Sequence, residues 1–463
     1  MKTIKYLIPA LFLLMIIIFN GCKTEFKPQT ATSGNAKFNN CIFIGGDFMA
    51  GYSNGGLSSD IQHNSIPDLL WSKIGSLSSG GFGHHYITNG YGLNFPLHNP
   101  QFCTPFHLGY KSDCLGVSSL FPLNDSISMS DPNLIDNLTS HTISPAASTT
   151  VFAYPYSKIT DYFDPAFSIS YLNGGRNPYF PKYVYGNGNN TIMGDVMRNQ
   201  FTFFTIWPGM EDVFEYAKRG GENEMITDFA TFDATLDKVL DSLVSKGAQG
   251  VIANIPDIDV FPFYTFISSQ ALVLDSGNAA LLNQFLNPHL YFNIGPNGFI
   301  IMDTTLGSIN GWRSSLEPNF PFRLMNPDEY VLLSVPTDSM KCNKMGALGP
   351  IPGHYVLDKY ELMNINAAIQ HFNSRISQSA ASHKIPMVDM NSFFRQIKNG
   401  YAYDGISFSS QFIQGAFFSL DGYHPTAQGY GLLTNQFILT INNYYKSTLP
   451  LVDITTLPGI VFP

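Results

Sequence analysis

Short apolar runs alternate with segments of helical periodicity along the chain, and this alternation limits the possible folds more than any other feature. The apolar run at residues 41–44 ends in Gly45-Gly46, which indicates a buried strand leading into a tight turn. Strands that alternate with helices predict a parallel sheet with helices on both faces, which is a three-layer α/β/α fold. The expected strands are residues 41–44, 201–206, 251–255 and 385–390, and the expected helices are residues 229–243, 362–376 and 426–444.

Two stretches do not follow this alternation. Residues 75–147 are rich in Gly, Ser, Asn and Pro and show no clear period, and residues 258–340 are also irregular. The length of 463 residues allows two or three domains, or one large domain with insertions. We expect a single domain over residues 39–463, enlarged by loop-rich insertions at about 75–147 and 258–340.

The charge balance excludes one large class of partners. Lys and Arg number 25 against 34 Asp and Glu, the net charge is −9, and the sequence has no basic run. Because a nucleic-acid-binding surface needs clustered positive charge, we expect no nucleic-acid partner. Charged residues make up 13% of the chain, which is too few for a disordered chain or a coiled coil.

The N-terminus has the features of an export signal. Lys2 and Lys5 precede an apolar run at residues 6–19, which is too short to span a bilayer comfortably. The following Gly21-Cys22 resembles a bacterial lipobox, in which the cysteine is acylated. We therefore expect a lipoprotein signal peptide at 1–21, a tether at 22–38 and a lipid anchor on Cys22. These features predict an exported protein of the bacterial cell envelope, held at a membrane. The alternative is an ordinary signal peptide that happens to hold a cysteine.

Four cysteines remain after Cys22, and they indicate a disulfide rather than a metal site. Cys103 and Cys114 are close in a loop-like stretch, so an exported chain could pair them. Cys41 lies in a predicted strand and is expected to be a buried thiol. The sequence has no CxxC pair, which argues against a zinc ribbon. We expect no cofactor and no bound metal.

Polar side chains gather at three places that the fold can bring together. Asp47 follows the first predicted strand, and Glu211-Asp212 follows the strand at 201–206. In an open α/β sheet, ligands bind beyond the carboxyl ends of the strands. Asp421 and His424 precede the last helix, at a spacing that lets the carboxylate accept Nδ1–H and fix the tautomer while Nε2 takes a proton. The alternative is a structural Asp–His turn that caps the helix.

These motifs together resemble the SGNH (GDSL-type) hydrolases, in particular their long lipoprotein-like members. The resemblance implies an SGNH-hydrolase or flavodoxin-like three-layer fold and hydrolysis of ester bonds. It also implies that His424 is the general base and Asp421 its orienting partner. The motifs that carry the resemblance are residues 46–52 with 54–57, 64–67, 203–205 with 209–212, 250–256 and 421–426.

The departures from the family pattern concern the groups that perform the chemistry. Phe48 follows Gly-Asp, where the family places its nucleophilic serine, and a phenyl ring cannot form an acyl-enzyme. Tyr156 aligns with the glycine of the oxyanion hole, and Glu211 replaces its asparagine donor. A carboxylate would repel a developing oxyanion. The His424–Asp421 dyad is retained, and Asp47 and Asp212 are expected at the rim of the site.

We therefore expect a catalytically degenerate ester-hydrolase relative, a pseudoenzyme that binds a glycan, lipid or ester. Phe48 and Tyr156 would line its former active-site floor. One alternative is an active ester hydrolase (an esterase, lipase or carbohydrate deacetylase) that combines His424 and Asp421 with a relocated nucleophile. The candidate nucleophiles are Ser53, Ser58 and Ser59. In a third reading, Asp47, Glu211, Asp421 and His424 converge to bind a divalent cation or to act as an acid–base pair.

Overall fold

A computed structural model provides the structure of the chain. The predicted signal peptide and Cys22 lie outside the residues that it describes. Within the described part of the chain, no helix is both long and apolar enough to cross a membrane. The described residues are 30–87, 102–128, 130–131, 149–169, 173–179, 190–286, 289–302 and 322–463.

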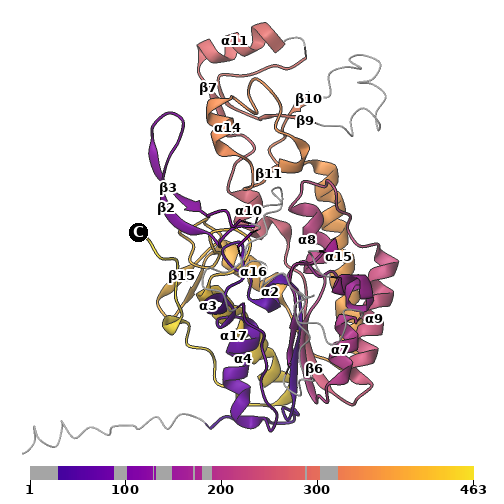
Figure 1. The fold of residues 1–463 in the computed structure, drawn as a ribbon. Helices are drawn as coiled ribbons and strands as arrows, with labels where there is room; N and C mark the ends of the chain where they lie inside the picture. The colour runs from indigo at the N-terminus through magenta and orange to yellow at the C-terminus, as the bar shows by residue number, and fades with distance from the viewer. Residues whose placement is uncertain are drawn as a thin grey trace, which may run out of the picture.

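A parallel sheet of five strands, counted over the described residues, forms the centre of the fold (Figure 1). The strand order is β13-β6-β5-β1-β4, which is the 2-1-3-4-5 order of flavodoxin-like folds. Residues 203–206 and 251–253 lie in strands as predicted, whereas β4 was not predicted because only three residues form it. The strands are β1 (Cys41–Gly45), β4 (Val151–Ala153), β5 (Phe203–Trp207), β6 (Gln249–Ala253) and β13 (Met387–Val388).

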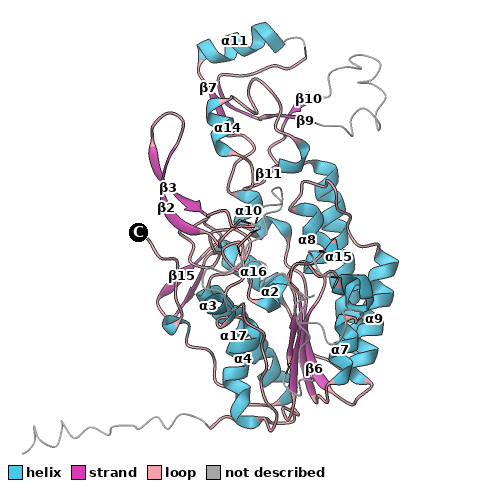
Figure 2. Cartoon of the chain, viewed as in Figure 1, coloured by secondary structure: helices cyan, strands magenta, loops and turns pink. Residues whose placement is uncertain are grey.

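Helices cover both faces of this sheet, so the predicted three-layer α/β/α class is confirmed (Figure 2). Helices α4 and α17 pack together on one face, and α7, α8, α9 and α15 cover the other. Their bounds are α4 (Ile66–Ile74), α7 (Ile192–Arg198), α8 (Met210–Ala217), α9 (Phe229–Val244), α15 (Lys359–Ser382), α16 (Met390–Asn399) and α17 (Ala427–Tyr445).

The long helices begin at side-chain caps and bury one apolar stripe. The Asp228 carboxylate accepts from the Thr231 N–H at the start of α9, and the Thr426 hydroxyl accepts from the Gly429 N–H at the start of α17. The Phe232 ring on α9 stacks on Phe372 of α15 with centroids 3.8 Å apart. The predicted helical periodicity therefore corresponds to a buried interface between α9 and α15.

Both insertions contain more regular structure than their sequences indicated. The strands of the first have no continuous buried face, and those of the second have only two or three residues each. The first holds the antiparallel hairpin β2 (His107–Ser112) and β3 (Ser118–Leu123). The second rises beyond the sheet and has small apolar cores of its own. Its elements include α10 (Pro262–Thr265), β7 (Leu272–Leu274), α11 (Ser276–Leu286), β8 (Gly295–Asn297), β9 (Ile300–Met302), β10 (Phe322–Leu324), β11 (Tyr330–Val331) and α14 (Thr337–Cys342).

A disulfide connects the two insertions. Cys114, in the turn of the β2–β3 hairpin, is bonded to Cys342 at the end of α14. The predicted Cys103–Cys114 bond is therefore wrong, because the hairpin carries Cys114 away from Cys103 and toward the second insertion. Cys103 and Cys41 are buried thiols, and burial raises the pKa of Cys41 to about 12.

Candidate functional site

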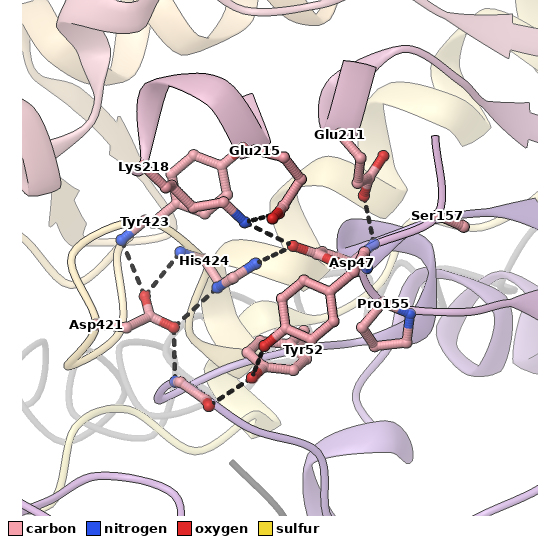
Figure 3. A network of polar contacts seen from close by, with 12 residues as sticks. Asp47, Tyr52, Pro155, Ser157, Glu211, Glu215, Lys218, Asp421, Tyr423 and His424 are labelled. Carbon is pink, nitrogen blue, oxygen red and sulfur yellow. Dashed lines mark hydrogen bonds and ion pairs between the residues drawn. The ribbon is translucent and has the colours of Figure 1, made fainter. Parts of the chain in front are cut away.

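Three chain segments meet at the carboxyl ends of β1 and β5, where the strand order reverses (Figure 3). Asp47 begins the short helix α2 (Asp47–Ala50) directly after β1. Glu211 lies in the first turn of α8, directly after β5. The loop before α17 brings Asp421 and His424 to the same place. The three polar clusters identified in the sequence thus form one site.

His424 and Asp421 are in direct contact. His424 Nδ1 lies 2.8 Å from Asp421 Oδ2, and the same oxygen accepts from the Gly55 N–H at 2.7 Å. Asp421 Oδ1 accepts from the backbone N–H groups of Tyr423 and His424. Burial lowers the pKa of His424, but the adjacent Asp421 charge outweighs burial and the net shift is upward. The dyad has the geometry of an oriented base, with Nε2 directed away from Asp421.

The side chain opposite His424 is Asp47, not Phe48. His424 Nε2 lies 3.2 Å from Asp47 Oδ2. Phe48 is buried in an aromatic cluster, with its ring centroid 5.2 Å from that of Trp207 and 5.4 Å from that of His424. The side chain opposite His424 Nε2 is therefore one residue earlier in the chain than Phe48. Successive side chains of a helix diverge by about 100°, so only the first residue of α2 points at the histidine.

Lys218 pairs with Asp47 beneath the surface. Lys218 Nζ, at the end of α8, lies 3.3 Å from Asp47 Oδ2 and 2.5 Å from Glu215 Oε1. Burial raises the pKa of Asp47, but the Lys218 charge and the His424 hydrogen bond bring it far below its usual range. Burial lowers the pKa of Lys218, but Glu215 and Asp47 outweigh burial and raise it. The sequence analysis identified neither Lys218 nor Glu215. Their three-residue spacing at the end of a mostly apolar helix could have indicated an ion pair.

Tyr156 contributes a backbone donor to the same carboxylate. Its N–H donates to Asp47 Oδ1 at 2.7 Å, and its φ of 63° is in the left-handed region that favours glycine. Its hydroxyl lies 2.8 Å from that of Tyr52. Tyr156 therefore has a glycine-like backbone and directs its N–H at the Asp47 carboxylate.

Glu211 accepts a hydrogen bond from the second backbone N–H group of the site, that of Asp47. The Asp47 N–H donates to Glu211 Oε1 at 2.6 Å. A Cβ atom on Gly46 would lie 1.9 Å from that oxygen, so this contact requires glycine. Burial, followed by the Asp47 charge, raises the pKa of Glu211 well above its usual range. Burial and the adjacent Asp47 carboxylate therefore both disfavour a charge on Glu211, which accepts the Asp47 N–H through a carboxyl oxygen.

Asp212 and the candidate serines have other roles. Asp212 is fully buried, accepts from the Ile159 N–H and the Thr227 hydroxyl, and has its pKa raised to about 6 by burial. It braces α8 and does not lie at the rim as predicted. Ser53 Oγ donates to the Pro425 carbonyl and Ser58 Oγ caps the helix α3 (Ser59–Gln62), so both hydroxyls are engaged away from His424 Nε2.

A cavity of about 550 Å³ opens above the dyad. Its floor includes Tyr52, Tyr156, Lys218, Asp421 and His424. Its walls come from both insertions and from residues 412–420, and they are mainly hydrocarbon and aromatic. A cavity of this size accommodates a small-molecule ligand. The wall residues include Phe106, Leu120, Phe121, Pro122, Phe263, Phe266, Leu333, Thr337, Phe412, Ile413 and Leu420.

The site offers acid–base groups, and among the described residues no serine hydroxyl contacts His424 Nε2. Both backbone N–H groups at its centre, those of Asp47 and Tyr156, already donate to carboxyl oxygens of the chain. Within the described ranges, no cluster of three or more His, Cys, Asp or Glu side chains has a metal-binding arrangement. The four residues of the cation hypothesis do converge, but they do so as hydrogen-bonded pairs.

No family model and no curated protein matches the chain. Among solved structures, the chain is similar to the lipase/acylhydrolase from Enterococcus faecalis, with 9% identity and a TM-score of 0.31. The match covers 89% of this chain and 98% of that one. At this TM-score the likeness carries no conclusion about function.

Proposed function

We propose that this protein is a membrane-anchored relative of the SGNH (GDSL-type) hydrolases that binds an amphiphilic, lipid-like ligand and does not hydrolyse esters through a serine. The flavodoxin-like strand order and the hydrogen-bonded Asp421–His424 pair before α17 support this relationship. The anchor at Cys22 is part of the proposal and rests on the leader sequence.

One observation is the basis for proposing that the protein does not hydrolyse esters through a serine. A serine hydrolase needs a hydroxyl at the base and unoccupied N–H donors for the oxyanion. Here His424 Nε2 meets the Asp47 carboxylate, and the N–H groups of Asp47 and Tyr156 donate to Glu211 and to Asp47 itself. An ester bound above this floor would find neither the nucleophile nor an open oxyanion hole.

The cavity walls favour a lipid over a glycan. A glycan needs many hydrogen-bonding partners, whereas the walls are mainly Phe and Leu side chains with a few polar ones, Asn124, Ser126, Ser334 and Thr337. An alkyl or acyl chain would bury apolar surface on both sides, which stabilises the complex by about 25 cal/mol per Å². The polar floor at Lys218 and His424 would meet the functional group at the end of the chain.

Two assays on the purified protein test this function. Short-chain p-nitrophenyl esters and acetylated sugars should be turned over at background rate by the wild type and by His424→Ala. A dansyl-labelled fatty acid should bind, and Leu333→Glu should weaken it at least tenfold by placing a charge in the apolar wall. Phe285→Glu is the matched control, because Phe285 on α11 is 71% exposed and is not among the residues that line the cavity. Ester turnover that His424→Ala abolishes would refute the proposal.

The anchor needs a separate test. Labelled palmitate fed to producing cells should be incorporated into the wild type and not into Cys22→Ala. Cys41→Ala is the control, since Cys41 is a buried thiol in β1. Equal labelling of the wild type and Cys22→Ala would contradict acylation at Cys22.

A further inference from the structure

The β2–β3 hairpin is held firmly at its base and weakly at its turn. At the base, Phe102 and Ile127 are buried, and the Ile127 N–H donates to the Phe102 carbonyl at 2.7 Å. In the turn, Leu115 and Val117 are 70% and 59% exposed, so the turn does not rest on an apolar surface. A two-stranded hairpin without such support is only marginally stable in water. The position of the turn therefore depends on its contacts with α14.

Two kinds of contact connect the turn with α14. Cys114 in the turn is bonded to Cys342 at the end of the helix. The ion pairs beside this bond each contain an exposed lysine, Lys111 or Lys341, and exposed pairs contribute little to stability. Of these contacts, the covalent bond is therefore the one that fixes the hairpin against the helix.

The two elements that the bond joins are also walls of the cavity. Leu120, Phe121 and Pro122 of β3 line it, and so does Thr337 at the start of α14. The hairpin lies beside the second insertion, whose elements rise beyond the sheet (Figure 1). The bond thus keeps one apolar wall in place against the other.

We infer that the Cys114–Cys342 bond is a redox-sensitive latch, which a dithiol opens to free the hairpin and release the ligand from the cavity. This inference rests on the ligand cavity of the proposed function and adds a control of release to it. Cys114 is exposed and Cys342 is half-buried, so Cys114 is the more accessible residue for an attacking thiolate. Exposed disulfides are the ones that exchange readily, whereas buried ones persist.

The opening reaction is a thiol–disulfide exchange that needs only the dithiol. One thiolate of the dithiol attacks the Cys114 sulfur, the bond to the Cys342 sulfur breaks, and Cys342 leaves as a thiolate that takes up a proton. The second thiolate of the dithiol then attacks the mixed disulfide, and Cys114 leaves in the same way. The protein gains two thiols, and the dithiol becomes a cyclic disulfide, so two electrons pass from the dithiol to the protein.

Limited trypsin digestion tests the latch without a ligand. The wild-type full-length protein in detergent is reduced with dithiothreitol, its thiols are capped with iodoacetamide, and the reductant is removed before digestion. Cleavage after Lys111 in β2 should become about tenfold faster than in protein that was capped without reduction, because a strand must leave its partner to enter a protease. Cleavage after Lys384, in the exposed turn after α15, is the matched control and should not change. An unchanged rate at Lys111 would overturn the inference.

Dissociation of the dansyl-labelled fatty acid tests whether the latch controls the ligand. Reduction and capping should raise the dissociation rate about tenfold, since withdrawal of one wall side chain such as Leu120 removes its burial against the ligand. Cys114→Ser with Cys342→Ser should match the reduced protein whether or not the dithiol is added. Cys103→Ser should keep the full response, because Cys103 lines the cavity as a free thiol. A response in the double variant, or none in Cys103→Ser, would contradict the inference.

Three further outcomes separate the latch from other roles of the bond. If reduction speeds cleavage after Lys111 but leaves dissociation of the probe unchanged, the latch inference fails and the binding function stands. If reduction abolishes the far-UV circular dichroism, the bond is required for the whole fold and the inference also fails. If the probe does not bind the oxidised protein, the proposed function fails, and the inference about release fails with it.

Discussion

The floor of the cavity and the outer face of helices α9 and α15 use the same residue types for different purposes. On the floor, Asp47 meets Lys218 and His424 in a buried set. Between the helices, three aspartates of α9 meet His371 and Arg375 of α15 and its capping residue His383 in a partly exposed ladder. In the ladder, water competes for every partner, whereas on the floor the protein alone must satisfy each charge. Loss of one partner should therefore cost little at the surface and much more beneath the cavity, where the other charge stays buried and unpaired.

The spacing of the ladder explains why it is a surface feature. Asp233, Asp237 and Asp241 are four residues apart, so they form a row along one side of α9. His371 Nε2 lies 3.0 Å from Asp233, and His383 Nε2 lies 2.9 Å from Asp241, whose side chain is 74% exposed. The Phe232–Phe372 stack and its apolar neighbours hold the two helices together beneath this row.

The largest expected effect is at the floor. Lys218→Met removes the cation between Asp47 and Glu215 and should lower the free energy of unfolding by about 3–5 kcal/mol, because two carboxylates stay buried without it. Guanidinium unfolding followed by circular dichroism measures this. Lys218→Met combined with Asp47→Asn should recover part of the loss. A loss below about 1 kcal/mol would contradict the difference between floor and ladder.

The disulfide between the insertions should give the next largest effect. Cys114→Ser with Cys342→Ser removes a crosslink between residues 228 apart and should lower the free energy of unfolding by about 2–4 kcal/mol. The same change should weaken binding of the dansyl-labelled fatty acid, since Phe121 and Thr337 line the cavity on either side of the bond. Cys103→Ser is the control and should leave a non-reducing gel unchanged. Equal stability of the double variant and the wild type would refute this role.

Two ion pairs join the same two segments, and in both of them the lysine is exposed. Lys111 pairs with Asp338, and Lys341 pairs with Asp113, across the hairpin and α14. Lys111→Met should therefore change stability by less than about 1 kcal/mol. Unfolding of this variant under oxidising conditions, compared with the serine double variant, separates the covalent contribution from the ionic one.

The sheet and the dyad could be predicted from the sequence, because both depend on local pattern. Apolar runs specify the strands, and the three-residue spacing of Asp421 and His424 permits their contact. The identity of the residue opposite His424 could not be predicted, since one residue of turn geometry decides whether Asp47 or Phe48 faces it. Lys218 reaches Asp47 only because α8 ends beside α2. The Cys114–Cys342 bond depends on two insertions that meet only in the folded chain.

In the ladder, the loss of one cation should be small. Arg375→Met removes the partner of Asp237, which also accepts from the Ser379 hydroxyl at 2.9 Å. The free energy of unfolding should fall by only about 0.2–1 kcal/mol, because water reaches Asp237 and replaces the guanidinium. Guanidinium unfolding in parallel with Lys218→Met gives the direct comparison. A loss as large as that of Lys218→Met would mean that the ladder is as desolvated as the floor.

The smallest effect should be the pH dependence of the stability that the last ion pair of the ladder, His383–Asp241, contributes. Burial lowers the pKa of His383, but the hydrogen bond to Asp241 outweighs burial and raises the pKa above about 6.5, its value in an unfolded chain. A histidine with a raised pKa adds stability that is fully present below the unfolded pKa and lost as the pH rises through the folded one. The melting temperature of the wild type should therefore exceed that of His383→Gln at pH 6, and the difference should shrink by pH 8.5.

Asp241→Asn should bring the NMR-detected pKa of His383 down, and high salt should do the same because Asp241 is exposed. If salt leaves the pKa of His383 unchanged, the His383–Asp241 pair is shielded from solvent. This end of the ladder would then not differ from the cavity floor in its exposure to water.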